Sequence, residues 1–309
     1  MLTPNLLVIL GATAMGKTRL AAYTAYQLGG EVLSADSRQV YKGLDIGTGK
    51  DYGDYTIQDF AVPYHLIDLI DAGKTYHVNQ FKHDFFIAFK QLQQRSVMPI
   101  LCGGSGLYID AVLRNLAYTS IPNNFQLRTS INNLNHHELI AYFNALPETE
   151  FTAKADLSSI KKTIRAIEIC DYLNHYEFIP VEYPALQPII FGLHSTVEWR
   201  SQRILERLHH RLNNGLIDEV QGLLNNGIAA EQLIYYGLEY KFVTQYLLGV
   251  MSYQALEELL GRAIIQYAKR QMTYFRKMMR DGHRIHWIDA TMSTEEQFAE
   301  IKQHLHDNN

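Results

Sequence analysis

Residues 11–18 read Gly-Ala-Thr-Ala-Met-Gly-Lys-Thr, a complete phosphate-binding loop of the pattern G-x-x-x-x-G-K-[ST]. This pattern requires a strand before it and a helix after it, and the flanking sequence is typical of both. Residues 6–10 form a short apolar run, and residues 18–28 contain neither glycine nor proline. The sequence therefore predicts a strand, a loop and a helix that together bind a di- or triphosphate.

Each part of this loop has a physical role in holding an anion. The glycines let backbone N–H groups turn towards the ligand, and the helix N-terminus adds its positive dipole end. Lys17 supplies a full positive charge, and we expect the hydroxyl of Thr18 to bind Mg²⁺, which is the predicted cofactor. The predicted phosphate-binding residues are Gly11, Ala12, Thr13, Ala14, Met15, Gly16, Lys17 and Thr18.

Composition limits the kind of partner and compartment. The 309 residues carry a formal net charge of -4, so the overall field does not favour nucleic acid, and such a partner would need a local basic patch. The two cysteines form no C-x-x-C pair, which argues against a disulfide framework and fits a reducing compartment. No stretch approaches the roughly 20 apolar residues of a membrane span, so we expect a cytoplasmic protein without a membrane anchor.

The rest of the chain predicts an α/β fold, a parallel sheet flanked by helices as in P-loop NTPases. Further strands are predicted at 31–36, 62–70, 98–102 and 188–193, and helices at 78–94, 107–113, 198–214, 216–224 and 252–280. Between them, residues 117–184 change in composition and predict an inserted small helical lobe, with helices at 135–146 and 157–173. Residues 1–116 and 185–309 then form the core, and the polar tail after Trp287 is expected to be peripheral.

Polar residues follow two of the predicted strands. Asp36, Ser37, Arg38 and Gln39 end the second strand, and Ser105 follows the strand at 98–102. Ligands of open α/β sheets bind at this carboxyl edge. Asp36 is therefore either a general base or a simple turn residue, and Ser105 a helix N-cap, a ligand donor or both. The second of these strands runs into Gly-Gly-Ser without the acidic residue that a kinase or NTPase would place there.

Two helical segments carry dense positive charge. The inserted lobe has Lys161, Lys162 and Arg165 within about one helical turn, and the predicted helix at 252–280 carries Arg262, Lys269, Arg270, Arg276 and Lys277. A basic stripe is usually a solvated face, but these are denser than solubility requires. They are the candidate local patches for a nucleic acid.

Five sequence blocks resemble the tRNA dimethylallyltransferases, also called isopentenyl-diphosphate:tRNA transferases. The blocks are GATAMGKT at 11–18, SADSRQVYKGLDIGTGK at 34–50, VPYHLIDL at 62–69, ILCGGSGLY at 100–108 and AKRQMTYFRK at 268–277. Their order and spacing match the family as far as about Trp287, which covers nearly the whole chain. The block around Asp36 is the most specific of the five.

The resemblance implies a prenyltransferase that uses dimethylallyl diphosphate as donor and releases diphosphate. The N6 atom of an adenosine beside the anticodon of tRNA would attack the allylic carbon, Asp36 would accept its proton, and Ser105, where the family usually has threonine, would help to bind the diphosphate. The resemblance places the anticodon stem-loop against Asp36, Ser37, Arg38, Gln39, Lys161, Lys162, Thr163, Ile164, Arg165, Lys269 and Arg270. It also implies a monomer.

The chain departs from the family pattern at several positions, which marks it as a divergent member. The usual Arg-x-x-Gly-Tyr-Arg block reads Ile-Tyr-Tyr-Gly-Leu-Glu at 234–239, so two arginines are missing. An arginine before the last block is Ile265, its tryptophan is Tyr274, and the lobe lacks an Asp-Pro stretch. Transfer to a free adenine nucleotide (AMP, ADP or ATP), a small-molecule kinase and a non-catalytic RNA binder remain as alternatives.

Overall fold

The computed structural model describes residues 4–307 and divides the chain into two compact units. The first contains the residues up to Arg114 together with those from Pro184 onward, and the second is Asn115–Tyr183. The extreme ends of the predicted core ranges, residues 1–3 and 308–309, lie outside the described residues.

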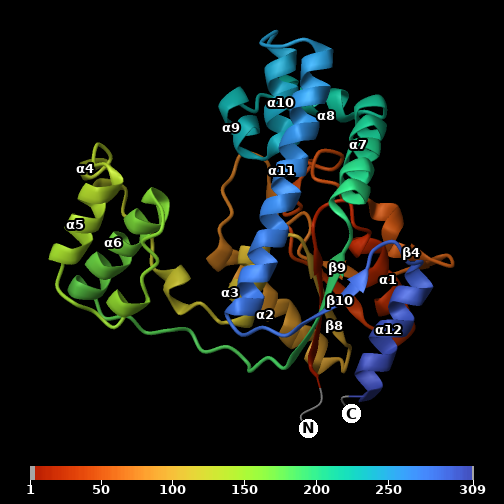
Figure 1. Ribbon diagram of the computed structural model, residues 1–309, viewed down its shortest axis with the longest axis horizontal. Helices are drawn as coiled ribbons and strands as arrows, with labels where there is room; N and C mark the ends of the chain where they lie inside the picture. The colour runs from red at the N-terminus through yellow and green to blue at the C-terminus, as the bar shows by residue number, and fades with distance from the viewer. Residues whose placement is uncertain (1–3, 308–309) are drawn as a thin grey trace. The chain divides into compact units, whose positions relative to one another are not determined.

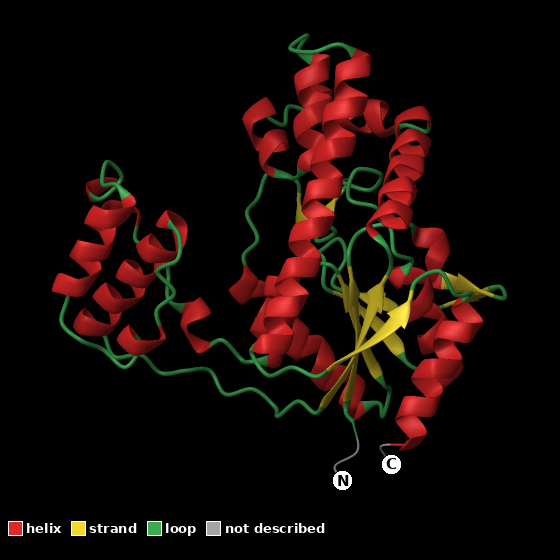
Figure 2. Ribbon diagram, in the orientation of Figure 1, coloured by secondary structure: helices red, strands yellow, loops and turns green. Residues whose placement is uncertain are grey.

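A six-stranded sheet forms the centre of the first unit, with strand order β10-β9-β1-β8-β2-β6 (Figures 1 and 2). The strands are β1 (Leu6–Gly11), β2 (Glu31–Ser34), β6 (Tyr64–His65), β8 (Pro99–Gly103), β9 (Pro188–His194) and β10 (Ile285–Asp289). All five pairings are parallel, and every residue of β1 is buried because β8 and β9 flank it on both sides. The predicted α/β fold with a parallel sheet is thus confirmed.

Helices cover both faces of this sheet (Figure 1). They are α1 (Lys17–Leu28) and α12 (Thr294–Asp307) on one face, and α2 (Val78–Gln94), α3 (Gly106–Leu113) and part of α11 (Tyr253–Arg280) on the other. Gly16 and Gly29 bound α1 in left-handed backbone conformations, which glycine adopts without a steric penalty. Helix α2 buries Phe81, Phe85 and Phe89, which recur at helical spacing.

A helical layer stands beyond the carboxyl edge of the sheet, at the top of Figure 1. It consists of α7 (Val197–Asn213), α8 (Leu216–Asn225), α9 (Ala230–Tyr235), α10 (Leu238–Leu247) and the first half of α11. The segment that forms α9 and α10 was assigned no element from the sequence. Helix α11 is 28 residues long and runs from this layer down to β1, so one helix can present side chains to the phosphate loop.

The single strand predicted at 62–70 is wrong. Residues in this stretch form two separate short strands, β6 in the main sheet and β7 (Ile70–Asp71), which pairs with β3 (Tyr41–Lys42). Between them the backbone turns through positive φ angles of 65° at Leu66 and 55° at Asp68, which no strand accommodates. A small hairpin of β4 (Thr56–Ile57) and β5 (Phe60–Ala61) precedes this stretch after the 3₁₀ turn η1 (Tyr52–Tyr55).

The expectation of a peripheral tail is also wrong. Strand β10 extends the sheet beside β9, and α12 packs against α1. The ring of Phe298 lies 5.6 Å from that of Tyr23, and Ile301 is fully buried. The segment is polar on its outer face only, and its inner face closes the core.

The second unit has its own small core. It contains η2 (Ala117–Ser120), α4 (Phe125–Ser130), α5 (His136–Ala145), η3 (Thr152–Lys154) and α6 (Ile160–His175). Helices α5 and α6 pack together over Leu139, Phe143 and Ile167. Within residues 4–307, none of the helices combines the length and the apolar character that crossing a membrane requires.

Candidate active site

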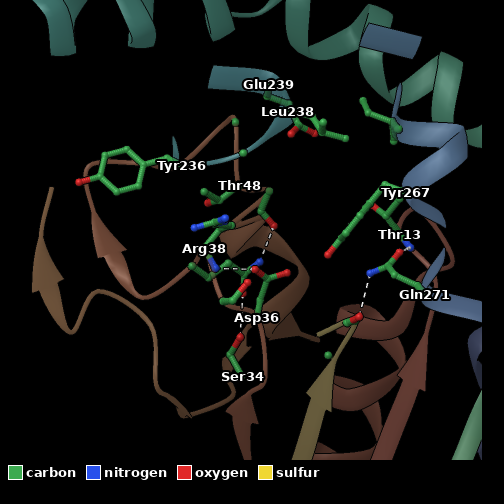
Figure 3. A pocket seen from close by; sticks show the side chains of 18 of the residues that line it. Thr13, Ser34, Asp36, Arg38, Thr48, Tyr236, Leu238, Glu239, Tyr267 and Gln271 are labelled. Carbon is green, nitrogen blue, oxygen red and sulfur yellow. Dashed lines mark hydrogen bonds between the residues drawn. The ribbon is translucent and has the colours of Figure 1, made fainter. Parts of the chain in front are cut away.

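A cavity of about 430 Å³ opens at the carboxyl edge of the sheet in the first unit, between the strand ends and helices α7, α10 and α11 (Figure 3). Its lining joins four parts of the chain that are distant in sequence. Those parts are the phosphate loop (Thr13, Lys17, Thr18), the segment after β2 (Ser34, Asp36, Ser37, Arg38, Gln39, Gly47, Thr48, Gly49), the turn after β8 (Gly103, Gly104) and the helical layer (Arg207, Arg211, Tyr235, Glu239, Tyr267, Arg270, Gln271).

The phosphate loop has the geometry that anion binding requires. Ala14 and Gly16 adopt positive φ angles of 61° and 78°, and Gly16 begins α1. The ammonium group of Lys17 donates to the carbonyl oxygen of Ala12 at 2.6 Å. The pKa of Lys17 is lowered to about 8, mainly by burial and in part by the nearby charge of Arg207, while the charge of Asp36 opposes the shift. An anion in the cavity would favour the charged lysine.

Asp36 lies in a tight turn at the end of β2, across the cavity from α10 and α11 (Figure 3). One carboxylate oxygen accepts the backbone N–H of Arg38 at 2.8 Å. No hydrogen bond among the described residues engages the second oxygen. The turn interpretation and the general-base interpretation are therefore compatible, because the turn uses only one oxygen and holds the other in the cavity.

Ser105 occupies the N-cap position of helix α3, as predicted, but its side chain makes no capping hydrogen bond within the described structure. Its hydroxyl oxygen instead accepts the backbone N–H of Ser37 at 3.0 Å, next to Asp36. Gln39 ties the same segment down by accepting from the hydroxyl of Ser34 at 2.8 Å and donating to the carbonyl of Gly49 at 3.0 Å. These bonds hold Asp36 to Gln39 along the cavity wall.

Gln271 links the phosphate loop to the turn after β8, a role that the sequence interpretation missed. Its side-chain oxygen accepts the N–H of Thr13 at 2.9 Å, and its nitrogen donates to the carbonyl of Gly104 at 2.9 Å. A side chain at Gly104 would collide with this amide. The signal was present in the sequence, because a glutamine on the otherwise apolar face of a helix needs polar partners when it is buried.

The segment between β3 and η1 forms another wall and is anchored by Glu219 of α8. The carboxylate of Glu219 accepts the backbone N–H groups of Asp45, Ile46 and Gly47 at 3.0, 2.7 and 3.1 Å. It also accepts the hydroxyl of Tyr240 at 2.6 Å. We call this set of four hydrogen bonds to the carboxylate of Glu219 the 45–47 anchor. It fixes the position of the segment between β3 and η1.

Two arginines and a glutamate from the helical layer enter the cavity, and none of them was predicted from the sequence to be a site residue. Arg207 and Arg211 of α7 contact Asp51 at 3.0 and 3.4 Å. Glu239 stands where the family pattern has an arginine, and Figure 3 shows it across the cavity from Asp36. Burial raises the pKa of Glu239, and Arg211 opposes this shift. The spacing of the two arginines, four residues apart on one helix, was the available signal.

Aromatic rings and cations lie together around the cavity. The guanidinium group of Arg38 lies 5.2 Å from the ring centre of Tyr235, and that of Arg270 lies 5.8 Å from the ring of Tyr267. Arg270 lines the cavity, and both Arg270 and Lys269 beside it are exposed on α11. Such pairs suit a ligand that offers both flat bases and phosphates.

The remaining predicted tRNA-binding residues belong to α6 of the second unit, where three of the five serve the lobe itself. Thr163 is fully buried and donates to the carbonyl of Ser159, Ile164 packs against the lobe core, and Arg165 donates to the carbonyl of Ile121 at 2.6 Å. Lys162 pairs with Asp156 at 2.7 Å on the surface, and Lys161 is exposed. Of these five predicted residues, only Lys161 and Lys162 are exposed to solvent.

The predicted magnesium ion would need a phosphate ligand in this cavity to complete its coordination. Mg²⁺ prefers oxygen ligands and usually takes one or two from the protein, the others being phosphate oxygens and water. Thr18, whose hydroxyl is the predicted protein ligand of Mg²⁺, lines the cavity. Within the described chain, no group of three or more His, Cys, Asp or Glu side chains forms a metal cage independent of a ligand.

Comparison with known proteins identifies the family. The family model described as IPP transferase matches residues 39–278. The chain belongs to the IPP transferase family. It is 47% identical over 292 residues to tRNA dimethylallyltransferase 1 of Porphyromonas gingivalis, covering 94% of this chain and 96% of that protein, and 45% identical over 298 residues to tRNA dimethylallyltransferase 1 of Parabacteroides distasonis, covering 96% and 95%.

Solved structures agree with this assignment. The tRNA isopentenylpyrophosphate transferase of Bacillus halodurans superposes with a TM-score of 0.71 at 28% identity, over 99% of this chain and 96% of that one. The predicted family and the predicted enzyme class, a prenyltransferase, are confirmed. The departure at 234–239 therefore occurs within a chain that matches these two relatives over 96% and 94% of its length.

Proposed function

We propose that this protein transfers the dimethylallyl group of dimethylallyl diphosphate to N6 of an adenosine beside the anticodon of tRNA and releases diphosphate. One observation carries the proposal, namely that a single cavity joins a phosphate loop, with Lys17 and Thr18, to a carboxylate with a free oxygen, Asp36. Relatives named for tRNA dimethylallyl transfer, which match almost the entire chain, support the same activity.

The donor diphosphate would lie against the phosphate loop. Backbone N–H groups at the start of α1 and the ammonium group of Lys17 would neutralise it, as in other phosphate loops. Mg²⁺, held by Thr18 and the diphosphate oxygens, would supply further positive charge to the leaving group. The dimethylallyl group would then point away from the loop towards Asp36.

The reaction breaks one bond and forms another at the allylic carbon. As the C–O bond to diphosphate breaks, its electron pair stays with the leaving group, and the N6 atom of the adenine forms the new C–N bond. The free oxygen of Asp36 would accept the proton that N6 loses. Ser105 would act by holding Ser37 and thereby the orientation of Asp36.

An RNA acceptor suits the surroundings of the cavity better than a free nucleotide does. Proteins recognise RNA loops by splaying bases onto aromatic and guanidinium planes, and Tyr235 with Arg38 forms such a surface beside Asp36. Lys269 and the lobe lysines Lys161 and Lys162 would meet the phosphates of the anticodon stem-loop. We further propose that the protein acts as a monomer in the cytoplasm.

The deciding experiment offers labelled dimethylallyl diphosphate and Mg²⁺ to three acceptors. These are tRNA with adenosine beside the anticodon, the same tRNA with guanosine at that position, and AMP. We expect label in the first tRNA only, because guanosine has no N6 amino group. Label in AMP at a comparable rate would favour the free-nucleotide alternative, and ATP turnover without prenyl transfer would favour a kinase.

A further inference from the structure

Helix α3 carries a buried carboxylate, that of Asp110, on the side that contacts α11. Only 3% of this side chain is exposed, although it lies in the middle of a helix. Burying a carboxylate costs free energy unless charged or hydrogen-bonding groups meet it. The groups that meet Asp110 come from α3, from α11 and from the turn after α11, so this one residue joins three parts of the chain.

Three side chains surround the carboxylate. The hydroxyl of Tyr274, on α11, donates to Oδ2 of Asp110 at 3.2 Å. The Nε2 atom of His283, in the turn that follows α11, lies 3.2 Å from Oδ1, and the Nε atom of Arg114 lies 3.6 Å from the same oxygen. Burial and the charge of Asp110 raise the pKa of the Tyr274 phenol, so the hydroxyl keeps the proton that it donates. We call these four residues the Asp110 cluster.

The Asp110 cluster lies one helical turn beyond the contact between Gln271 and Gly104. Along α11, Tyr274 follows Gln271 by three residues, so both side chains lie on one side of the helix. A Cβ atom at Gly106 would lie 2.4 Å from the Tyr274 ring, which shows that the ring packs directly on the start of α3. Asp110 follows Gly106 by four residues. The two contacts are therefore successive links between α11 and the segment that leads into α3.

The first of these links extends into the active site. The amide of Gln271 accepts from Thr13 of the phosphate loop and donates to Gly104 of the turn after β8 (Figure 3). Ser105, in the same turn, accepts the backbone N–H of Ser37 in the opposite wall of the cavity. A displacement of α11 along α3 would therefore disturb the phosphate loop and the turn together.

We propose that Asp110 is a positioning residue, which holds α11 in register with α3 so that Gln271 can join the phosphate loop to the turn after β8. Asp110 lies outside the lining of the cavity described above, so it acts through Gln271 and not on the ligand. Tyr274 stands where the family pattern has tryptophan, so the hydroxyl that reaches Asp110 belongs to this chain's departure from that pattern. The proposal rests on the proposed function only for the choice of diphosphate as the ligand.

The direct test measures binding of inorganic diphosphate with Mg²⁺ by isothermal titration calorimetry, at a temperature at which circular dichroism shows each variant to be folded. Asp110→Ala should raise the Kd by about 5- to 30-fold, the equivalent of losing one or two hydrogen bonds in the phosphate loop and its supports. Tyr274→Phe removes a single hydroxyl and should raise the Kd in the same direction by less. A Kd within about twofold of the wild type in both variants would overturn the proposal.

Glu31→Ala is the matched control. Glu31 is also a buried carboxylate, 10% exposed, and it contacts Arg95 and His65 at 2.6 Å each. It begins β2 at the amino edge of the sheet, whereas the cavity opens at the carboxyl edge. Glu31→Ala should keep the wild-type Kd. An increase as large as that of Asp110→Ala would show that the loss of any buried carboxylate has this effect, and the positioning role would be rejected.

A double-mutant cycle tests the route through Gln271, which a merely stabilising role would not involve. In a chain that already carries Gln271→Ala, Asp110→Ala should change the Kd by less than about twofold, because the link that it supports is gone. Any larger increase would show that Asp110 acts by another route and would overturn the proposal. If Asp110→Ala does not fold, Tyr274→Phe takes its place in the same cycle.

Transfer of the labelled prenyl group to tRNA is assayed in parallel. Absence of transfer by the wild type would contradict the proposed function and leave the diphosphate cycle valid. Unchanged diphosphate affinity in Asp110→Ala and Tyr274→Phe, together with normal transfer, would overturn the positioning role and leave the proposed function in place.

Discussion

Burial is the main reason that the pKa of the Lys17 ammonium group is lowered from 10.5 to about 8. A bound diphosphate favours the charged lysine and raises this pKa again, so binding takes up a proton above pH 8. Affinity for diphosphate should be constant between pH 7 and 7.5 and fall above pH 8, by at most about tenfold per pH unit. Arg207, with a pKa of about 10, stays charged over most of this range.

Calorimetric titration at pH 7 to 9 measures this dependence. Lys17→Ala should bind diphosphate more weakly at every pH and lose the slope, because the titrating group is gone. A wild-type affinity that does not change up to pH 9 would contradict the prediction.

The second prediction at this scale concerns Asp36. Asp36→Asn keeps an acceptor for the N–H of Arg38, so the turn should persist, but the amide cannot accept a proton from N6. We expect turnover to fall by about 10²- to 10⁴-fold while the Kd for diphosphate changes little. Single-turnover transfer to tRNA measures the turnover, and calorimetry measures the Kd for diphosphate. Near-normal turnover would leave Asp36 as a turn residue only.

At the scale of elements, helix α8 fixes the position of one cavity wall through the 45–47 anchor. Glu219→Gln replaces one acceptor oxygen by an N–H donor and sets it against groups that are all donors. We expect the free energy of unfolding to fall by about 1–3 kcal/mol, since buried donors lose their acceptor. Tyr240→Phe removes a single contact and should cost less.

Urea denaturation measures these losses, with Asp218→Asn as a control because Asp218 is exposed on the same turn of α8. Equal stability of Glu219→Gln and Asp218→Asn would show that the anchor contributes little.

Predicted elements agree with the observed ones where the sequence signal is local, and they differ where it is not. Helix boundaries such as those of α1 and α7 agree within one residue, because caps and apolar periodicity are local. The strand predicted at 62–70 failed because an apolar run does not reveal the positive φ angles that bend it. The tail failed because its polar composition hid the one face that packs on α1.

For the whole molecule, the net charge of -4 confines RNA binding to local patches. If Lys161 and Lys162 contact RNA phosphates, affinity for tRNA should fall steeply with salt, by roughly 0.7 to 0.9 log units per log unit of salt for each phosphate neutralised. Replacing both lysines with alanine should flatten this slope. Arg165 is left intact because it holds the carbonyl of Ile121, so its loss would disturb the lobe itself.

Filter binding of tRNA at several salt concentrations measures the slope, and Lys302→Ala, an exposed lysine on α12, is the control. A double variant with the wild-type slope would exclude the two lysines from the interface. Diphosphate affinity should stay unchanged in both variants.

The sequence by itself determined the phosphate loop and the parallel α/β class. Both depend on contiguous residues, a glycine that permits a left-handed turn at Gly16 and apolar runs that must be buried. It also placed Asp36 at the correct edge, because the carboxyl ends of parallel strands meet there.

Only the tertiary structure decided what surrounds these residues. Gln271 lies 258 residues from Thr13, Arg211 lies 160 from Asp51, and Glu219 lies 172 from Gly47. No local pattern encodes such pairings, since they arise when the helical layer packs over the sheet edge and buried polar groups must find partners there. The phosphate loop could therefore be predicted from eight contiguous residues, whereas Arg207 and Arg211 became part of the site only through the fold.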